Sequence, residues 1–418
     1  MERRRVVITG LGTINPLGHN VQEYFEALEA GANGVDLIKG FDTEVCKTKV
    51  GAEVKNYNPE EYFDRKEVRK LDLFEQYAVI AATEAVADSG LDQYEALDKS
   101  RVGVIWGAGI GGINSTYDEI ESHFTTSTPT AAYSPFLLLK ILPNMAAGYI
   151  SLKYGYKGPA FSTVSACASS THSIISAVDQ IRLGRADVMI TGGSESAVSF
   201  IGIQAFNAMR ALSTRNDDPK SASRPYDKDR DGFVMGEGGG ALVVEEYEHA
   251  VARGAKIYAE IVGCGVSADA YHVTAPEPEG EGAKAAMAMA LADAGVAPEA
   301  IDYINTHGTS TPLGDLAELK GIKKVFGDHA YKLNISATKS MTGHLLGGAG
   351  AIELLASVLA VTKDVVPPTI NVQELDPEID PALNLTLDKA QYRTVEYAMS
   401  NTFGFGGQNS TVIIKKVK

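Results

Sequence analysis

Residues 162–183 read STVSACASSTHSIISAVDQIRL, and this stretch carries the pattern on which our fold prediction rests. Small residues surround Cys167 after an extended run, and three apolar residues then recur at helical spacing until Gly184. The pattern predicts a strand, a tight loop and a helix over about 168–183.

Cys167 is the first candidate for chemistry in this stretch. A thiol at the start of a helix faces unpaired backbone N–H groups and the positive end of the helix dipole. Both favour the thiolate, which is the nucleophilic form. A small thiol that fills core space is the other interpretation, and the local pattern leaves both open.

Strand-like and helical patterns alternate along the 418 residues, which predicts an α/β fold with largely parallel sheets. Strands are expected at 5–9, 102–106, 188–191, 241–245, 257–264, 303–306, 334–337 and 411–415. Helices are expected at 73–89, 168–183, 282–294, 316–325 and 350–362.

The two halves of the chain repeat one pattern. Each half opens with a strand that ends in glycine and small residues, and each later places a strand, a loop of small residues and a helix in succession. We therefore expect a duplicated fold with an N-terminal half, 1–253, and a C-terminal half, 254–418. The boundary follows a strand at 241–246, which we expect at a sheet edge.

Composition and charge narrow the class of protein. Hydrophobic residues make up 44% of the chain, which is typical of a globular protein with a large core. A formal net charge of −15 argues against nucleic acid or an anionic membrane as a partner. We also expect no apolar stretch of about 18 residues, the length of a membrane span.

The three cysteines are Cys46, Cys167 and Cys264. They are far apart in the chain and form neither a disulfide framework nor a CxxC metal motif. We therefore expect a reducing compartment and no bound metal.

Two segments match known motifs only in part. Residues 107–112 read GAGIGG and fit GxGxxG, but no second strand with an acidic residue follows about 20 positions later. Residues 227–232 read DKDRDG, like the start of an EF-hand loop, but Gly238 stands where that loop needs its glutamate. We expect a glycine turn lining a pocket in the first case and a structural loop in the second.

Two histidines and an ion pair are candidates to join Cys167. His307 follows a strand in NTHGTST and His344 precedes a helix in KSMTGHLLGGAG. Both lie in loops at the sheet edge where α/β folds place their sites. Glu353 lies in an otherwise apolar helix, where a lone carboxylate is costly to bury, so we expect Lys339 as its partner.

The segment 401–409 reads NTFGFGGQN and alternates glycine with phenylalanine. It is either a tight turn before the last strand or a flexible gate whose backbone N–H groups face a substrate oxygen.

Four separated motifs together resemble the elongating β-ketoacyl-[acyl-carrier-protein] synthases: VSACAS at 164–169, HGTST at 307–311, KSMTGH at 339–344, and 401–407. Segments 211–216 and 224–240 look most like the type II members of that family. The resemblance runs essentially end to end and implies a thiolase-like fold. Such a fold has five layers, α-β-α-β-α, from two halves with a five-stranded sheet each.

The resemblance implies a decarboxylating Claisen condensation in fatty acid elongation. An acyl group moves from acyl carrier protein to the thiolate of Cys167. Malonyl-carrier protein then loses CO₂, and its carbanion attacks the acyl-enzyme. The product is a 3-oxoacyl-carrier protein two carbons longer. No cofactor is implied, because the phosphopantetheine arm belongs to the carrier protein.

The resemblance also implies residue roles. His307 and His344 would stabilise the enolate as neutral imidazoles, while Lys339 with Glu353 would organise the charge of the site. Backbone N–H groups of Cys167 and Phe405 would form the oxyanion hole, with Phe405 as a gate and Gly404 as its hinge. The implied substrate contacts are Thr309 and Thr311 for the phosphopantetheine arm, and Ile110 and Phe206 for the acyl chain.

A homodimer that binds acidic carrier proteins is implied as well. The docking residues would be Arg65, Lys66, Arg69, Lys70 and Arg210. Without the family, a solvated charged face explains the first four equally well. Ala131 and Ala132 depart from the pattern, because relatives often carry basic residues there.

Other functions remain to be separated from this one. Cys167, His307 and His344 are also a sensible ligand set for a zinc hydrolase. A non-catalytic, chain-length-controlling subunit would lack the cysteine. A polyketide-type ketosynthase shares every motif, so the active-site residues do not distinguish it.

Overall fold

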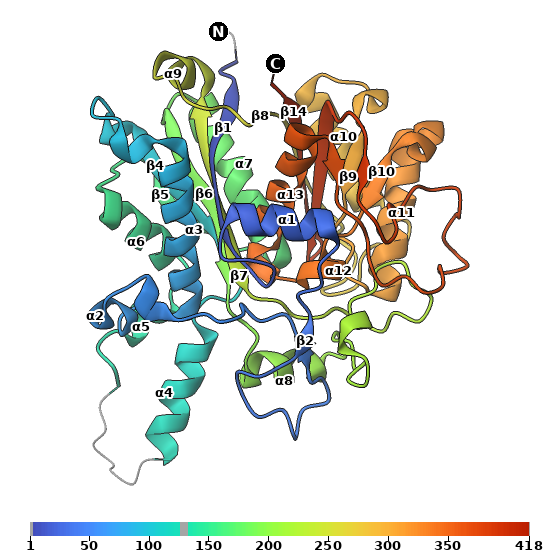
Figure 1. Ribbon diagram of the computed structural model, residues 1–418, viewed down its shortest axis with the longest axis horizontal. Coiled ribbons are helices and arrows are strands. Elements are labelled where there is room, and N and C mark those ends of the chain that lie inside the picture. The colour runs from blue at the N-terminus through green and yellow to red at the C-terminus, as the bar shows by residue number, and fades with distance from the viewer. Residues whose placement is uncertain (1–2, 126–132, 418) are drawn as a thin grey trace.

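The computed structural model describes residues 3–125 and 133–417, and its fold is built on one sheet of ten strands (Figure 1). The strands lie in the order β10-β9-β13-β14-β8-β1-β7-β6-β4-β5. Their bounds are β1 (Val6–Ile14), β4 (Val102–Gly107), β5 (Ala160–Thr163), β6 (Val188–Glu195), β7 (Gly238–Glu246), β8 (Ala259–Ala268), β9 (Tyr303–Asn305), β10 (Asn334–Ser336), β13 (Tyr397–Gly404) and β14 (Gln408–Lys416). Two short ribbons pair β2 (Asp36–Leu37) with β3 (Val50–Gly51) and β11 (Val365–Val366) with β12 (Gln391–Tyr392).

The sheet repeats one arrangement twice, so the fold is duplicated as expected. In the N-terminal half, β1 lies beside β7, and β6, β4 and β5 follow outward. In the C-terminal half, β8 lies beside β14, and β13, β9 and β10 follow in the corresponding order. The halves join where β1 pairs antiparallel with β8, at Val6 with Ile261 and Ile8 with Ala259.

Helices separate and cover the two half-sheets, which gives the five layers of the predicted thiolase-like fold (Figure 1). Between the half-sheets lie α7 (Ser169–Arg182), against β4 and β6, and α13 (Ala349–Lys363), against β9 and β13. The outer face of the N-terminal half is covered by α3 (Leu73–Ser89) and α6 (Met145–Tyr154). The outer face of the C-terminal half is covered by α10 (Glu281–Ala294), on which α11 (Pro312–Phe326) packs.

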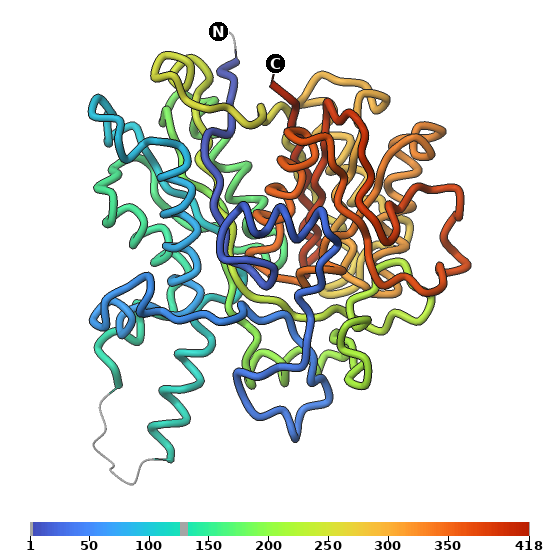
Figure 2. The backbone as a smooth tube through the Cα atoms, in the orientation of Figure 1, coloured from blue at the N-terminus to red at the C-terminus, as the bar shows by residue number. Residues whose placement is uncertain are grey.

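The remaining α-helices are α1 (Val21–Ala30), α2 (Arg65–Val68), α4 (Ile113–Thr125), α5 (Leu137–Ile141), α8 (Phe200–Ala208), α9 (Tyr247–Ala252) and α12 (Lys339–Thr342). Figure 2 shows the early chain, blue to green, mostly on one side and the late chain, orange to red, on the other. One segment of the N-terminal half packs against the C-terminal half. Tyr226 is part of the hydrophobic core of the C-terminal half, and Arg230 forms ion pairs with Asp315 and Asp376.

The helix predicted at 73–89 is present with the same bounds as α3. Asp72 and Glu75 form a reciprocal capping box at its start, and Gly90 ends it with a φ of 69°. The helix predicted at 168–183 begins at Ser169, as α7, directly after a 3₁₀ turn over Ala166–Ala168. Cys167 therefore lies in that turn, one step before the helix proper.

Three expectations about strands are wrong. The sheet is mixed, because only the pairs β4–β5, β4–β6, β9–β10 and β9–β13 are parallel in it. Strand β7, expected at an edge, lies between β1 and β6. Segment 401–409 is a loop only at 405–407, because its first residues end β13 and its last two begin β14. Alternating patterns locate strands but do not give their direction or neighbours.

One stretch corrects our expectation about apolar length. Leu346–Lys363, which includes α13, is long and apolar enough to cross a membrane by length and composition. Within the fold, 89% of this 18-residue stretch is buried. The central layer between two half-sheets explains its composition, because a helix enclosed by the protein faces almost no solvent on any side.

Candidate active site

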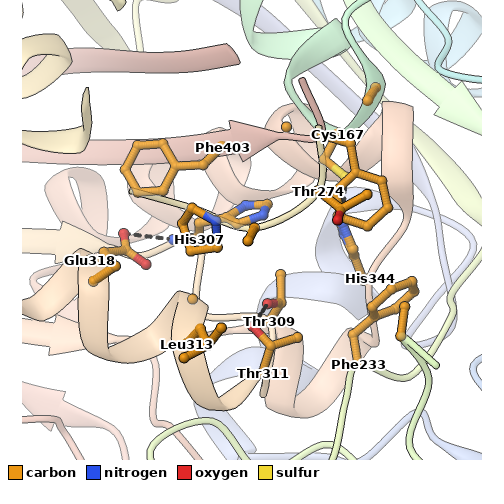
Figure 3. A pocket seen from close by; sticks show the side chains of 18 of the residues that line it. Cys167, Phe233, Thr274, His307, Thr309, Thr311, Leu313, Glu318, His344 and Phe403 are labelled. Carbon is orange, nitrogen blue, oxygen red and sulfur yellow. Dashed lines mark hydrogen bonds between the residues drawn. The ribbon is translucent and has the colours of Figure 1, made fainter. Parts of the chain in front are cut away.

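A cavity of about 790 Å³ opens beside loops that follow strands of both halves (Figure 3). Cys167 follows β5, His307 follows β9, and His344 follows β10 and the short helix α12. These are carboxyl ends of parallel strands, which is where α/β folds place their sites. The cavity is also lined by further residues singled out from the sequence: Ile110, Phe206, Arg210, Thr309, Thr311, Gly404 and Phe405.

The thiol of Cys167 contacts an imidazole from the other half of the chain. Nε2 of His344 lies 3.0 Å from the Cys167 sulfur, and both side chains are buried. The backbone at Ala166 has a φ of 49°, in the left-handed region, which turns the chain sharply just before the cysteine. The rings of His307 and His344 stand edge to face, with centroids 5.3 Å apart.

Backbone N–H groups near the start of the helix favour the thiolate of Cys167, as expected, but burial has the larger effect in the unliganded site. Burial raises the pKa of the Cys167 thiol to about 12, although the charge of Lys339 and the backbone N–H groups of Phe405 and Cys167 lower it. Desolvation of the thiolate outweighs these contributions. The resting thiol therefore holds its proton at neutral pH, and His344 is the group placed to accept it.

A buried carboxylate binds the backbone of the loop that carries His307. Glu318 of α11 accepts hydrogen bonds from the backbone N–H groups of His307, at 2.9 Å, and Gly308, at 3.0 Å. The amide of Asn401 donates to the same carboxylate at 3.2 Å. The ring of His307 packs against Phe403, with centroids 5.7 Å apart (Figure 3). Burial raises the pKa of Glu318 to about 7, against the effect of these donors.

Lys339 and Glu353 form the buried ion pair expected from the sequence. Both side chains are almost fully inaccessible, and Lys339 Nζ contacts Glu353 Oε1. Burial raises the pKa of Glu353 to about 7, although the Lys339 ammonium lowers it. Lys339 Nζ also lies 3.4 Å from Nδ1 of His307.

Both imidazoles are neutral in this setting. Burial, with the positive charge of Lys339, lowers the pKa of His307 and of His344 well below the usual value. A buried imidazolium beside a buried ammonium is doubly unfavourable. The site thus offers neutral imidazole nitrogens, a thiol and one fixed positive charge to whatever enters the cavity.

The Phe–Gly turn approaches the cysteine closely. A Cβ on Gly404 would lie 2.7 Å from the backbone oxygen of Ser165, so only glycine fits here without movement. Phe405 follows at the tip of the turn, and its ring faces Phe206 across the cavity with centroids 6.4 Å apart. The hydroxyl groups of Thr309 and Thr311 lie 3.1 Å apart on another wall (Figure 3).

Two family models match the chain in succession. The β-ketoacyl synthase N-terminal domain matches residues 3–250, and the C-terminal domain matches residues 258–373. A relative called 3-oxoacyl-[acyl-carrier-protein] synthase 2, from Coxiella burnetii (strain RSA 493 / Nine Mile phase I), is 50% identical over 420 residues and covers 100% of both chains. The chain belongs to the β-ketoacyl synthase family. It is therefore a condensing enzyme of the acyltransferase class.

Solved structures of the family match over the whole chain. A β-ketoacyl synthase from Burkholderia phymatum STM815 has a TM-score of 0.91 at 37% identity, covering 99% of this chain and 100% of that chain. AntDE, a ketosynthase solved with AntF, its type II polyketide synthase acyl-carrier protein, has a TM-score of 0.88 at 33% identity and covers 100% of both chains.

Geometry alone does not separate this β-ketoacyl synthase site from a metal site. Ligand atoms of Cys167, His307 and His344 lie within 4.8 Å of one another, as three zinc ligands would. Lys339, however, contacts His307 and would place a second positive charge beside a bound cation. Family membership points to condensing chemistry for the same three groups.

The residues predicted to dock a partner lie in two places. Arg65, Lys66, Arg69 and Lys70 are all exposed. Only Arg65–Val68 is helical, so the expected helical face is short, and Arg65 pairs with Glu60 at 2.9 Å. Arg210 instead lies at the cavity, with a left-handed φ of 56°. Ala131 and Ala132 lie outside the described residues.

The acidic loop 227–232 is structural, as expected. Arg224 contacts Asp231 at 3.0 Å, and the buried Arg230 pairs with Asp315 at 3.1 Å. Arginines thus neutralise the carboxylates around the loop. Arg230 also donates to the backbone oxygens of Thr311 and Pro312, so the loop braces one wall of the cavity.

Sequence reasoning missed Glu318 and the aromatic wall of Phe233 and Phe403. Glu318 had no distinctive signal, because Asp315 and Lys320 lie near it in the same helix, unlike Glu353 in its apolar helix. The two phenylalanines had no such signal either, because their contacts with His344 and His307 come from distant parts of the chain.

Proposed function

We propose that the protein is a type II 3-oxoacyl-[acyl-carrier-protein] synthase, which condenses malonyl-carrier protein with an acyl chain held on Cys167. The observation that carries this proposal is the contact of a buried thiol with a neutral imidazole at one end of a mostly apolar cavity. An apolar cavity suits an acyl chain, and the reactive groups lie where its thioester carbon would sit.

Acyl transfer begins when the Cys167 sulfur attacks the thioester carbon of acyl-carrier protein. His344 Nε2 accepts the thiol proton and returns it to the departing pantetheine sulfur. The backbone N–H groups of Cys167 and Phe405 act as the oxyanion hole, since both already donate toward the cysteine sulfur. We propose Thr309 and Thr311 as contacts for the phosphopantetheine arm.

Condensation follows when malonyl-carrier protein enters the occupied site. Loss of CO₂ leaves an enolate, and His307 and His344, in tautomers that donate N–H to its oxygen, stabilise it. The enolate carbon then attacks the acyl-cysteine carbon, and the Cys167 sulfur leaves and takes up one proton. Lys339 and Glu353 keep both imidazoles neutral and positioned, and Phe405 on Gly404 gates the two half-reactions.

The proposal includes the partner and the assembly of the protein. Acyl carrier protein docks through Arg65, Lys66, Arg69, Lys70 and Arg210. Two copies of the chain form a cytoplasmic homodimer, and within each chain the N-terminal half ends at residue 253 and the C-terminal half begins at residue 254. The outer strand β5 supports a dimer, since Phe161 within it and Val164 directly after it are 40% and 60% exposed. Sedimentation of the purified chain at the mass of one subunit would contradict the dimer.

Covalent loading tests the function directly. The protein is incubated with acyl-carrier proteins from C6 to C16, and the mass added at Cys167 is read by peptide mass spectrometry. We expect loading that disappears in Cys167→Ala, and a single two-carbon extension when malonyl-carrier protein follows. Elongation by Cys167→Ala would overturn the mechanism.

The same reaction separates the alternatives. A polyketide-type ketosynthase would extend the chain repeatedly with malonyl units and no reduction between them. A zinc hydrolase would contain stoichiometric zinc by elemental analysis and would resist acylation of Cys167.

A further inference from the structure

Glu195, the last residue of β6, is a buried carboxylate that binds two loops of the cavity wall at once. Its oxygens accept hydrogen bonds from the backbone N–H groups of Gly109, at 2.8 Å, Ile110, at 3.1 Å, and Gly111, at 3.0 Å. The backbone N–H of Gly347 donates to it at 3.1 Å. The side chain is 0% exposed. Four backbone donors therefore converge on one carboxylate.

These four backbone N–H groups are the groups that stabilise a negative charge on Glu195. Among the residues that the structure describes, no lysine or arginine forms an ion pair with it within 4.0 Å. Successive backbone N–H groups of a glycine turn form a concave anion site, which commonly holds a phosphate. Here the GAGIGG turn holds a side chain of its own protein. Burial raises the pKa of Glu195 to about 7, although the four N–H groups lower it.

Two of the four donors leave no room for a side chain beside this carboxylate. A Cβ on Gly109 would lie 2.8 Å from Glu195 Oε2. A Cβ on Gly347 would lie 2.2 Å from the backbone nitrogen of Gly109 and 2.7 Å from Glu195 Oε2, so the two loops approach closely where Glu195 binds both. Gly111 has a φ of 71°, which also favours glycine. Glu195 thus explains Gly109, whereas Gly107 and Gly112 are explained by close backbone neighbours in other segments, so no dinucleotide is needed to account for the glycines of this turn.

Both loops belong to the reacting site. Gly109 and Ile110 line the cavity beside Cys167, and Leu346 lines it next to Gly347. Gly347 follows His344 by three residues, so Glu195 links the turn that carries Ile110 to the loop that carries His344. Ile110 packs in one apolar cluster with Cys167 and Leu346.

We propose that Glu195 is a positioning residue that sets the shape of the acyl chamber by holding the 109–111 turn against the loop after His344. It touches no reacting atom and acts through Ile110 and Leu346. A chamber with fixed walls discriminates between acyl chains, because a chain that does not fit cannot be accommodated by movement. Release of the turn removes that discrimination. The proposal rests on the acyl-transferase function proposed above.

Glu195→Gln is the matched test, because it keeps the size of the side chain and replaces one acceptor oxygen with an NH₂ group. That group cannot accept a hydrogen bond. The variant therefore loses either the bond from Gly111 or the bonds from Gly109 and Gly347, according to which oxygen the NH₂ group replaces. The ratio of initial loading rates at Cys167 between the best and the worst chain from C6 to C16 should fall about five-fold. A ratio within two-fold of the unsubstituted protein would overturn the proposal.

Glu84→Gln is the control. Glu84 also accepts two backbone N–H bonds, from Thr13 and Val21 at 2.8 Å each, and burial raises the pKa of this carboxyl to about 7 as well. It does not line the cavity. Its chain-length ratio should stay unchanged; an equal fall in both variants would show general loosening and overturn a specific role for Glu195.

Hydrogen exchange keeps the proposal testable if Glu195→Gln does not fold. In the unsubstituted protein, the amides of Gly109, Ile110, Gly111 and Gly347 should exchange at least a hundred-fold more slowly than unstructured peptide. Exchange near the unprotected rate at these four amides would overturn the proposal. If no chain loads the unsubstituted protein, the proposed function fails, and the exchange result still decides the role of Glu195 in holding the two loops.

Discussion

The sulfur of Cys167 lies 3.0 Å from Nε2 of His344, although 177 positions separate the two residues in the chain. This contact joins the N-terminal half to the C-terminal half at the reacting centre. It also gives a buried thiol, whose pKa is raised to about 12, a neutral base to receive its proton. Activation of the thiol therefore depends on how the halves pack as well as on the start of α7.

The first prediction concerns thiol reactivity. Because the pKa of Cys167 lies near 12, its thiolate fraction should rise about tenfold per pH unit below that value. The rate of iodoacetamide labelling at Cys167, read by peptide mass spectrometry, should therefore climb steadily from pH 7 to 10. A plateau below pH 9 would show a thiol that is already ionised. Peptides containing Cys46 and Cys264 report whether the protein unfolds.

The second prediction concerns the two histidines. Their lowered pKa values keep both imidazoles neutral as the pH falls from 8 to 6. The ring nitrogen chemical shifts of His307 and His344, read by NMR, should thus show no titration over this range. Titration of either ring with a midpoint near 6.5 would contradict neutral imidazoles. Circular dichroism at each pH confirms that the fold persists.

The third prediction concerns the buried ion pair. Lys339→Met leaves Glu353 buried without its partner, which should lower the free energy of unfolding by about 3–5 kcal/mol. The double variant Lys339→Met with Glu353→Gln should recover part of that loss, because no uncompensated charge remains. Denaturant unfolding of the four proteins in this cycle measures the coupling. Additive single effects would mean that the pair contributes nothing.

The fourth prediction concerns the close packing of Gly404, next to Phe405, against Ser165. Gly404→Ala places a Cβ 2.7 Å from the Ser165 oxygen, which should cost about 1–3 kcal/mol of stability as strain. The shifted turn should also slow acyl loading of Cys167 at least ten-fold. Gly148→Ala is the control, since a Cβ there meets nothing closer than 3.8 Å. Normal loading by Gly404→Ala would show that the turn moves freely.

Much of the fold was predictable from short stretches of sequence. The helix at 73–89 and the repeated strand–loop–helix units follow from apolar spacing and glycine stops. Strand directions did not follow, since β7 lies antiparallel to β1 and β6, and β14 to β8, through pairings between segments far apart in the chain.

Some residues of the candidate site could likewise be predicted from the sequence, and others could not. Local composition indicated Cys167, His307 and His344, and the rule that buried charges are paired joined Lys339 to Glu353. Glu318 and Glu195 were not predicted in their roles, because nothing in the sequence around either carboxylate shows which backbone N–H groups it binds. Their contacts exist only once α11 and β6 are packed.

By itself, the sequence determined which chemical groups are present and which segments carry them, because periodicity, caps and lone charges act between near neighbours. The tertiary structure alone decided how those groups behave. Packing of the two halves buries the thiol, brings His344 to its sulfur and places Lys339 beside both imidazoles. Desolvation and Coulomb energies depend on distances through space. The raised pKa of the Cys167 thiol and the neutrality of His307 and His344 are therefore properties of the folded protein.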